Sequence, residues 1–270
     1  MLPTAKTAIE IDIERLIWLL YGPPGIGKST LLSKFASPIF GTTEPGHRHL
    51  NIYNRPLKDW LDFKVFNNQE LPSKAAEKFK TVGIDTVPLL YDRCSEFICK
   101  KKGWAHPSDL DFGKGYAVVN DEFKREMQIL CSHGKGVVFI AHQKQIEIKA
   151  RNMKYTKTTP DLPGGCMAIL KPIVDVIAYA GFSDKNMTSR VLVTEPREDL
   201  DAKFRQDEAK PPIPGVLPLD YNKLKEAWAK SQQSTIGKYS KRYTLTQDAL
   251  SAPVVKKIGS PVSVVRKIVQ

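Results

Sequence analysis

The scarcity of cysteine and the absence of a long apolar run narrow the class of protein before any motif is considered. The chain has four cysteines, at Cys94, Cys99, Cys131 and Cys166, and no C-x-x-C pair. This spacing indicates neither a zinc site nor a disulfide framework, so we expect reduced thiols in a core. No apolar stretch approaches the roughly 20 residues that a membrane helix needs. We therefore expect no membrane partner.

The N-terminal residues, MLPTAKTAIEIDIE, lack the basic and then apolar order of a secretion signal. A cytoplasmic location is the expectation that follows. Residues 9–13 alternate apolar with acidic side chains, and this alternation predicts a short edge strand.

Acidic residues are in the minority, and the basic excess is unevenly distributed. The formal net charge is +12, and residues 221–270 contain ten Lys and Arg against two Asp and Glu. A strongly basic chain is attracted to polyphosphates such as nucleic acid. The sequence thus predicts a core over residues 1–220 and a basic C-terminal extension over 221–270. This extension could bind DNA, a single-stranded-DNA-binding protein or nothing.

The strongest positive signal is the segment LIWLLYGPPGIGKST, residues 16–30. An apolar run predicts a buried strand, and a helical pattern begins at Thr30. Between them lies the G-x-x-x-x-G-K-S pattern of a phosphate-binding loop, or P-loop. In such loops backbone N–H groups hold nucleotide phosphates, the lysine reaches the β- and γ-phosphates, and the serine hydroxyl binds Mg²⁺. The residues expected to contact the nucleotide are Gly22, Pro23, Pro24, Gly25, Ile26, Gly27, Lys28, Ser29 and Thr30.

Three further apolar segments each end in a polar residue that can serve this site. They lead to Glu44, to Asp85 and to His142. In an open parallel sheet, ligands bind at the carboxyl ends of the strands. Asp85 is therefore expected to hold Mg²⁺ together with Ser29, and His142 to lie near the γ-phosphate if its strand neighbours that of Asp85. Amphipathic helices predicted at residues 88–102 and 116–132 complete an α/β pattern.

Residues 143–165 follow His142 directly and are predicted to form an exposed basic loop. Its cations and single ring are suited to a phosphate backbone and stacked bases. The residues expected to bind nucleic acid are Lys144, Lys149, Arg151, Lys154, Tyr155 and Lys157.

With these segments in order, the chain resembles the RecA-like P-loop NTPases. It is most similar to the compact phage-encoded ones grouped with single-strand annealing proteins and recombinases. The resemblance covers residues 14–220 and is carried by GPPGIGKST, PIFGTTEPG, KTVGIDT, FIAHQK, the pair Gly164-Gly165, and RVLVTEPRED.

This resemblance implies a mostly parallel central sheet with helices on both faces, ATP and Mg²⁺ as cofactors, and a host cytoplasm as location. It also implies that Glu44 activates the attacking water, that His142 contacts the γ-phosphate, and that the loop at 143–165 contacts single-stranded DNA. Only about twenty residues precede the P-loop, so we expect no separate N-terminal polymerisation domain of the kind found in that family. A ring, a short assembly and a monomer stay open, and homo-oligomers are among the expected partners.

The expected function is a P-loop ATPase, with Lys28, Glu44, Asp85 and His142 as catalytic residues, that binds single-stranded DNA and promotes annealing or recombination. The candidates for a cation acting across a subunit interface are Arg190, Arg197 and Arg205. Other functions remain open: a helicase loader or packaging motor, a nucleotide or small-molecule kinase, and a DNA-binding protein that holds ATP only as a structural ligand. The choice of ATP over GTP, and of DNA over RNA, is not decided by these residues.

Overall fold

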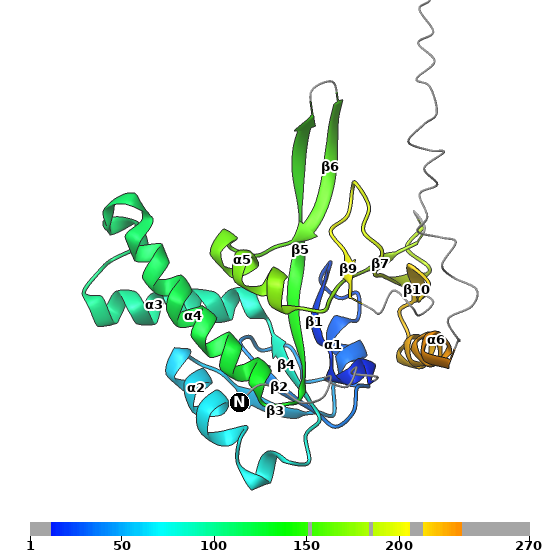
Figure 1. The fold of residues 1–270 in the computed structure, drawn as a ribbon, viewed down its shortest axis with the longest axis horizontal. Coiled ribbons are helices and arrows are strands. Elements are labelled where there is room, and N and C mark those ends of the chain that lie inside the picture. Colours follow the sequence, from blue (N-terminus) through cyan, green and yellow to red (C-terminus); the bar gives the residue numbers. More distant parts are fainter. Residues whose placement is uncertain (1–11, 151–152, 184–185, 206–212, 234–270) are drawn as a thin grey trace, which may run out of the picture. The chain divides into compact units, whose positions relative to one another are not determined.

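A ten-stranded sheet lies at the centre of the computed structural model, which describes residues 12–150, 153–183, 186–205 and 213–233. The strand order is β10-β8-β7-β1-β5-β4-β2-β3, with β6 paired to β5 and β9 paired to β7 (Figure 1). The strands are β1 (Ile17–Gly22), β2 (Pro38–Thr42), β3 (Tyr53–Pro56), β4 (Thr81–Asp85), β5 (Gly136–Ala150), β6 (Met153–Pro160), β7 (Val176–Phe182), β8 (Arg190–Val193), β9 (Lys203–Phe204) and β10 (Val216–Pro218).

The helices lie between these strands in the chain. The α-helices are α1 (Lys28–Leu32), α2 (Trp60–Val65), α3 (Val87–Lys102), α4 (Lys114–Ser132), α5 (Gly164–Ile173) and α6 (Tyr221–Gln233). A π-helical turn η2 (Phe66–Glu70) and the 3-10 turns η1 (Ile13–Arg15), η3 (Lys74–Ala76), η4 (Pro107–Asp109) and η5 (Asp111–Gly113) connect them. In the described ranges, none of these helices combines the length and the apolar character needed to cross a membrane.

The centre of the sheet is parallel. The pairs β7–β1, β1–β5, β5–β4, β4–β2 and β2–β3 all run in the same direction. Strands β6, β8, β9 and β10 are antiparallel additions to it. Parallel neighbours need long crossovers, which place helices over the sheet faces. The predicted α/β class with a mostly parallel central sheet is confirmed.

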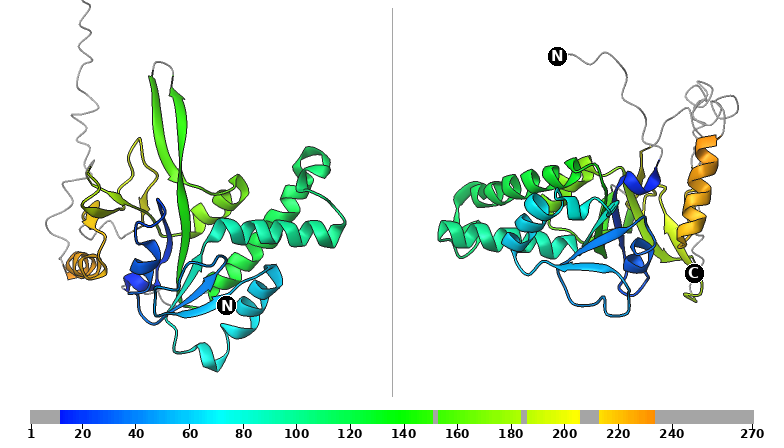
Figure 2. Two further views of the ribbon diagram at one scale, coloured as in Figure 1. Left: turned by 180° about the vertical axis from the view of Figure 1, so that it is seen from behind. Right: turned by 90° about the horizontal axis from the view of Figure 1, so that it is seen from below.

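Both faces of the sheet are covered, and for this reason β1 is apolar at nearly every position. Leu19 and Tyr21 point into one buried cluster with side chains of α2, α3, α4 and α5. Trp18 and Leu20 point into a second cluster, to which α1 and α6 contribute. Figure 2 shows these two helical layers on opposite sides of the sheet.

Helix α6 belongs to the second cluster, because its Leu224 and Trp228 are buried there. Helix α6, which lies in the first part of the predicted C-terminal extension, therefore packs against the sheet. The remainder of the predicted extension, residues 234–270, lies outside the described residues.

Two local predictions differ from the structure. Ile13, the last residue of the predicted edge strand at 9–13, lies in the 3-10 turn η1. The Asp12 carboxylate caps this turn by accepting a hydrogen bond from the Glu14 N–H. Residues 9–11 of the predicted strand lie outside the described residues. Strand β3 was not predicted. Its side chains are mostly exposed and show no alternation, so its strand conformation depends on pairing with β2.

Candidate functional site

The turn between β1 and α1 is a loop that depends on glycine. Gly22, Gly25 and Gly27 have φ angles of 155°, 72° and 111°, in the region that side chains disfavour. A Cβ atom on Gly22 would lie 2.0 Å from the carbonyl oxygen of Ala180 on β7. Space beside Gly25 is open. The loop thus follows the sheet edge closely and leaves its own backbone accessible.

Lys28 begins α1 and turns its ammonium group back over this loop. Its Nζ donates to the carbonyl oxygens of Gly22 and Pro23, both at 2.9 Å. The residue is only 6% exposed. Burial lowers the pKa of Lys28 to about 8, an effect that the charges of Asp85 and Glu44 partly oppose. A desolvated cation therefore lies at the loop, with two carboxylates near enough to act on it.

Ser29 and Asp85, the two predicted Mg²⁺ ligands, are in direct contact. Asp85 ends β4, and its Oδ2 accepts a hydrogen bond of 2.5 Å from Ser29 Oγ. The same oxygen lies 2.8 Å from Nε2 of His47. This hydrogen bond raises the pKa of His47. His47 was not predicted, because a single histidine in a loop carries no sequence signal of such a contact.

Glu44 is held at the same edge of the sheet through Thr86. Its Oε1 accepts a hydrogen bond of 3.1 Å from Thr86 Oγ1. The preceding residue, Thr43, donates its N–H to the carbonyl oxygen of Asp85 at 2.9 Å. The end of β2 is thereby fastened to the end of β4, which orients the Glu44 carboxylate.

His142 lies in β5, which runs between β1 and β4. Its strand is therefore the neighbour of the Asp85 strand, which is the condition for its predicted position near the γ-phosphate. It is opposite Gly22 in the register of β1, and Ile140 is opposite Asp85 in the register of β4. His142 Nδ1 and Oε1 of the next residue, Gln143, are buried without a hydrogen-bond partner. Such atoms usually find a partner in a ligand or in water.

These residues fit a magnesium nucleotide. The loop offers accessible backbone and a buried ammonium, Ser29 and Asp85 offer two oxygens, and two buried polar atoms lack partners. In the described part of the chain no three His, Cys, Asp or Glu side chains form a metal site alone. A Mg²⁺ ion here would therefore take further oxygen ligands from the nucleotide and water.

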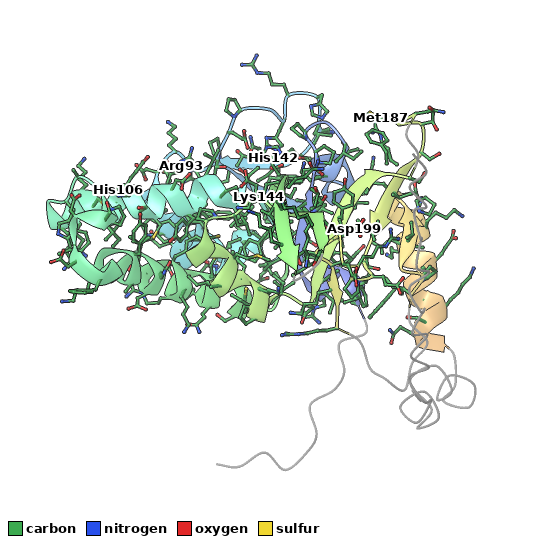
Figure 3. The ribbon with its side chains drawn as sticks, turned by 90° about the horizontal axis from the view of Figure 1, so that it is seen from above. Arg93, His106, His142, Lys144, Met187 and Asp199 are labelled. Atoms are coloured by element: carbon green, nitrogen blue, oxygen red, sulfur yellow. The ribbon has the colours of Figure 1, made fainter. Side chains whose placement is uncertain are left out.

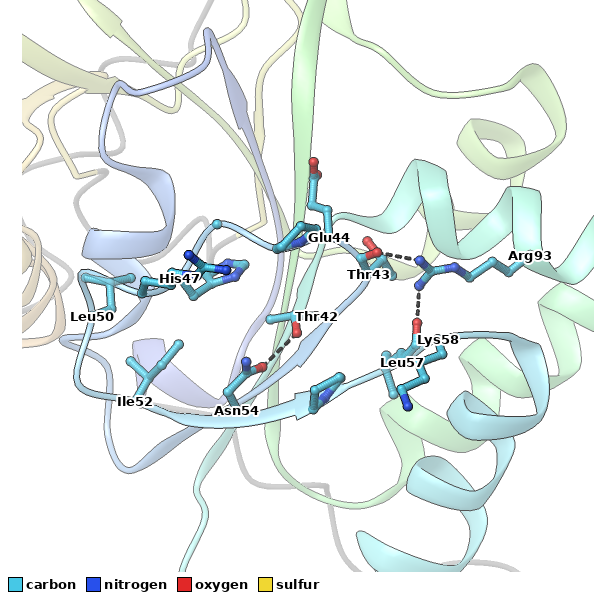
Figure 4. Close-up of a pocket in the computed structure, with 14 residues that line it drawn as sticks. Thr42, Thr43, Glu44, His47, Leu50, Ile52, Asn54, Leu57, Lys58 and Arg93 are labelled. Atoms are coloured by element: carbon cyan, nitrogen blue, oxygen red, sulfur yellow. Dashed lines mark hydrogen bonds between the residues drawn. The ribbon is translucent and has the colours of Figure 1, made fainter.

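A pocket of about 490 Å³ opens beside Glu44 and His47 rather than at the glycine loop (Figure 4). It is lined by residues that follow β2 and β3. At one side Arg93 of α3 donates hydrogen bonds to the carbonyl oxygens of Thr43 and Leu57. Because these bonds use both terminal nitrogens of the guanidinium, Arg93 holds the Glu44 segment in place.

The prediction that residues 143–165 form a loop is wrong. β5 continues through it to Ala150 and returns as β6, so that most of it is a β-hairpin, followed by the start of α5. Figure 3 shows His142 and Lys144 close together on β5. The two strands are held together by backbone hydrogen bonds to each other, which need no apolar side chains. The few apolar residues of this segment therefore gave no sign of a strand.

The hairpin distributes the predicted DNA-binding residues over two faces. Lys149 is directly opposite Lys154 on one face, whereas Tyr155 is opposite Ile148 on the other. Lys144 and Lys157 share the face of Tyr155, and they form ion pairs with Asp161 and Asp201; Lys154 is paired with Glu147. Arg151 lies outside the described residues.

Together the glycine loop, the buried lysine and the serine–aspartate pair define a P-loop ATPase. Agreeing with this, the family model described as "AAA domain" matches residues 14–206, and the chain belongs to that family. A comparison with curated proteins finds no match. Among solved structures, the chain is similar to a KaiC-like protein of the hyperthermophilic archaeon Pyrococcus horikoshii, with 15% identity, a TM-score of 0.40, and coverage of 76% of this chain and 89% of that one.

Replacing His47 with alanine should lower the Mg²⁺ concentration needed for nucleotide binding by a few-fold. His47 contacts the Asp85 oxygen that also binds Ser29, so a metal ion must displace it or bind around it. The measurement is a Mg²⁺ titration of ATP binding. His49→Ala, on the same loop and exposed, is the control, and an unchanged or higher Mg²⁺ requirement in His47→Ala would contradict this role.

Proposed function

We propose that this P-loop ATPase binds single-stranded DNA on the β5–β6 hairpin and couples that binding to ATP turnover, so as to promote annealing or recombination. The observation that carries the proposal is the continuity of β5. One strand passes His142, opposite Gly22 of the P-loop, and runs without interruption into the basic hairpin. A shift at His142 would therefore move the hairpin without an intervening flexible linker.

The chemistry follows from the placement of the side chains. Lys28 and the loop backbone would hold the phosphates, and Ser29 with Asp85 would hold Mg²⁺, whose charge neutralises them. Glu44 would accept a proton from the attacking water. His142, with its unpartnered Nδ1, would contact the γ-phosphate oxygens and report their loss to β5.

The hairpin itself suits a single strand of nucleic acid. On one face, Tyr155 lies beside Ile148 and near Ile146, which is 37% exposed, so bases can stack against an aromatic and aliphatic surface. On the other face Lys149 lies opposite Lys154, whose ion pair with the exposed Glu147 a phosphate would have to replace. Lys149 has no ion pair among the described residues, so its charge is available.

The deciding experiment measures phosphate release with single-stranded DNA, with duplex DNA and with neither. We expect single-stranded DNA to stimulate turnover. Stimulation by duplex DNA would favour a packaging or loading motor, and phosphoryl transfer to a small acceptor would favour a kinase. DNA annealing that is unaffected when Glu44 and Asp85 are neutralised would favour a structural role for ATP.

Changing both Lys149 and Lys154 to alanine should weaken single-stranded DNA binding and lower its salt dependence. Loss of two phosphate contacts reduces the slope of log K against log salt by about 1.4. Fluorescence anisotropy over a salt series measures both quantities. Lys100→Ala with Lys101→Ala, exposed positions on α3, removes the same charge elsewhere, and an equal loss in this control would refute a specific role for the hairpin.

A further inference from the structure

An arginine of the antiparallel edge of the sheet lies against the P-loop of its own chain. Arg190 is the first residue of β8, and its main chain is fixed by the Leu219 N–H, which donates to its carbonyl oxygen at 3.0 Å. A Cβ atom on Gly27 would lie 3.5 Å from Arg190 Nη1 and 3.7 Å from Leu219 Cδ2. The guanidinium is thus within about 5 Å of the Gly27 Cα.

The Arg190 side chain is exposed and forms no ion pair with any described residue. By contrast, Arg205 is used within the fold, where it donates to the carbonyl oxygen of Pro172 and pairs with Asp175. Arg190 is therefore a cation beside the phosphate loop that no described carboxylate neutralises.

The position of Gly27 indicates which part of a nucleotide Arg190 would reach. In a P-loop the backbone N–H groups hold the α- and β-phosphates, whereas the lysine reaches the β- and γ-phosphates. Lys28 lies over Gly22 and Pro23 at the beginning of the loop. Arg190 instead borders the backbone at Gly27, at the end of the loop, so we expect it near the α- and β-phosphates that the loop backbone holds.

We propose that Arg190 binds the α- and β-phosphates of the nucleotide held by its own chain, and does not act on the γ-phosphate of a neighbouring subunit. This inference rests on the nucleotide binding of the proposed function but not on DNA. A guanidinium forms charge-assisted, often bidentate hydrogen bonds with phosphate oxygens. Leu219 beside it would shield these bonds from water on one side.

The test compares ATP and ADP affinities of Arg190→Ala and of Arg190→Gln with those of the unchanged protein, by calorimetry and without DNA. Because both nucleotides carry α- and β-phosphates, we expect both dissociation constants to rise by a similar factor of about ten. Arg125→Ala, which removes an exposed arginine on α4 with no role in the proposed site, is the matched control. Unchanged affinities in both Arg190 variants, or an effect on ATP alone, would overturn the proposal.

Mixing variants distinguishes action within a chain from action between chains. The Lys28→Ala variant retains Arg190 but has a defective P-loop. The Arg190→Ala variant retains Lys28 and an intact P-loop but lacks the arginine. If Arg190 served a neighbour, the mixture would form sites with both residues and recover tight binding. We expect no recovery, and recovery would overturn the proposal. Wild-type protein that binds no nucleotide would instead refute the P-loop function itself, and normal binding without DNA stimulation would refute only the proposed DNA activity.

Discussion

Glu44→Gln is expected to slow ATP turnover about 100-fold or more while leaving ATP binding nearly unchanged. A general base typically contributes a factor of 100 or more to a rate, and an amide cannot accept the proton. Glutamine keeps the shape of the side chain and an oxygen that can still accept the hydrogen bond from Thr86 Oγ1. The Thr43 contact with Asp85 also remains, since it uses only backbone atoms of both residues. The variant should therefore accumulate bound ATP.

Single-turnover phosphate release and ATP binding, measured on the same preparation, test this expectation. Glu195→Gln is the control, because Glu195 is an exposed carboxylate that follows β8 and has no expected role in the reaction. A second variant, Thr86→Val, removes the hydroxyl that orients Glu44 and should give a smaller loss of rate. Turnover of Glu44→Gln within a few-fold of wild type would show that another group activates water.

The parts of this site that the sequence predicted are those determined by short segments of chain. The glycine loop, the apolar strands that end near Glu44, Asp85 and His142, and helices α3 and α4 each have a local pattern of apolar spacing or turn residues. Parallel strands then bring their carboxyl ends to one edge. This geometry explains how Glu44 and Asp85, which are 41 positions apart in sequence, come to lie at the ends of neighbouring strands that are joined by hydrogen bonds.

The parts that were missed depend on contacts between distant segments. The hairpin of β5 and β6 contains only scattered apolar residues, and its polar alternation is as typical of a loop as of an exposed strand. The role of His47 could not be predicted, because its partner, Asp85, ends a strand that is distant in the sequence. The place of Arg190 beside Gly27 depends on β8, an antiparallel strand between β7 and β10, whose position in the sheet no local pattern specifies.

Lys28→Ala should abolish detectable nucleotide binding without destabilising the unliganded protein. In the unliganded fold the ammonium is 6% exposed and is bonded only to carbonyl oxygens. Burial lowers the pKa of Lys28 to about 8, so the fold disfavours this charge. Removal of the side chain ends that desolvation cost, and water can reach the two carbonyl groups. The buried Lys28 ammonium therefore lowers the stability of the unliganded fold. A role in binding phosphates would explain why the residue is a lysine.

Thermal unfolding with and without Mg²⁺ and ATP separates the two effects. A ligand at 100 times its dissociation constant stabilises a protein by about 2.7 kcal/mol, so wild-type protein should melt at a higher temperature when ATP is added. Lys28→Ala should melt at or above the unliganded wild-type temperature and show no shift with ATP, whereas Lys34→Ala, at an exposed position just after α1, should behave as wild type. Among the described residues no other ammonium group is bonded to the glycine loop. If ATP raised the melting temperature of Lys28→Ala as it does that of wild type, or if this variant kept full ATPase activity, the triphosphate would not bind at the glycine loop.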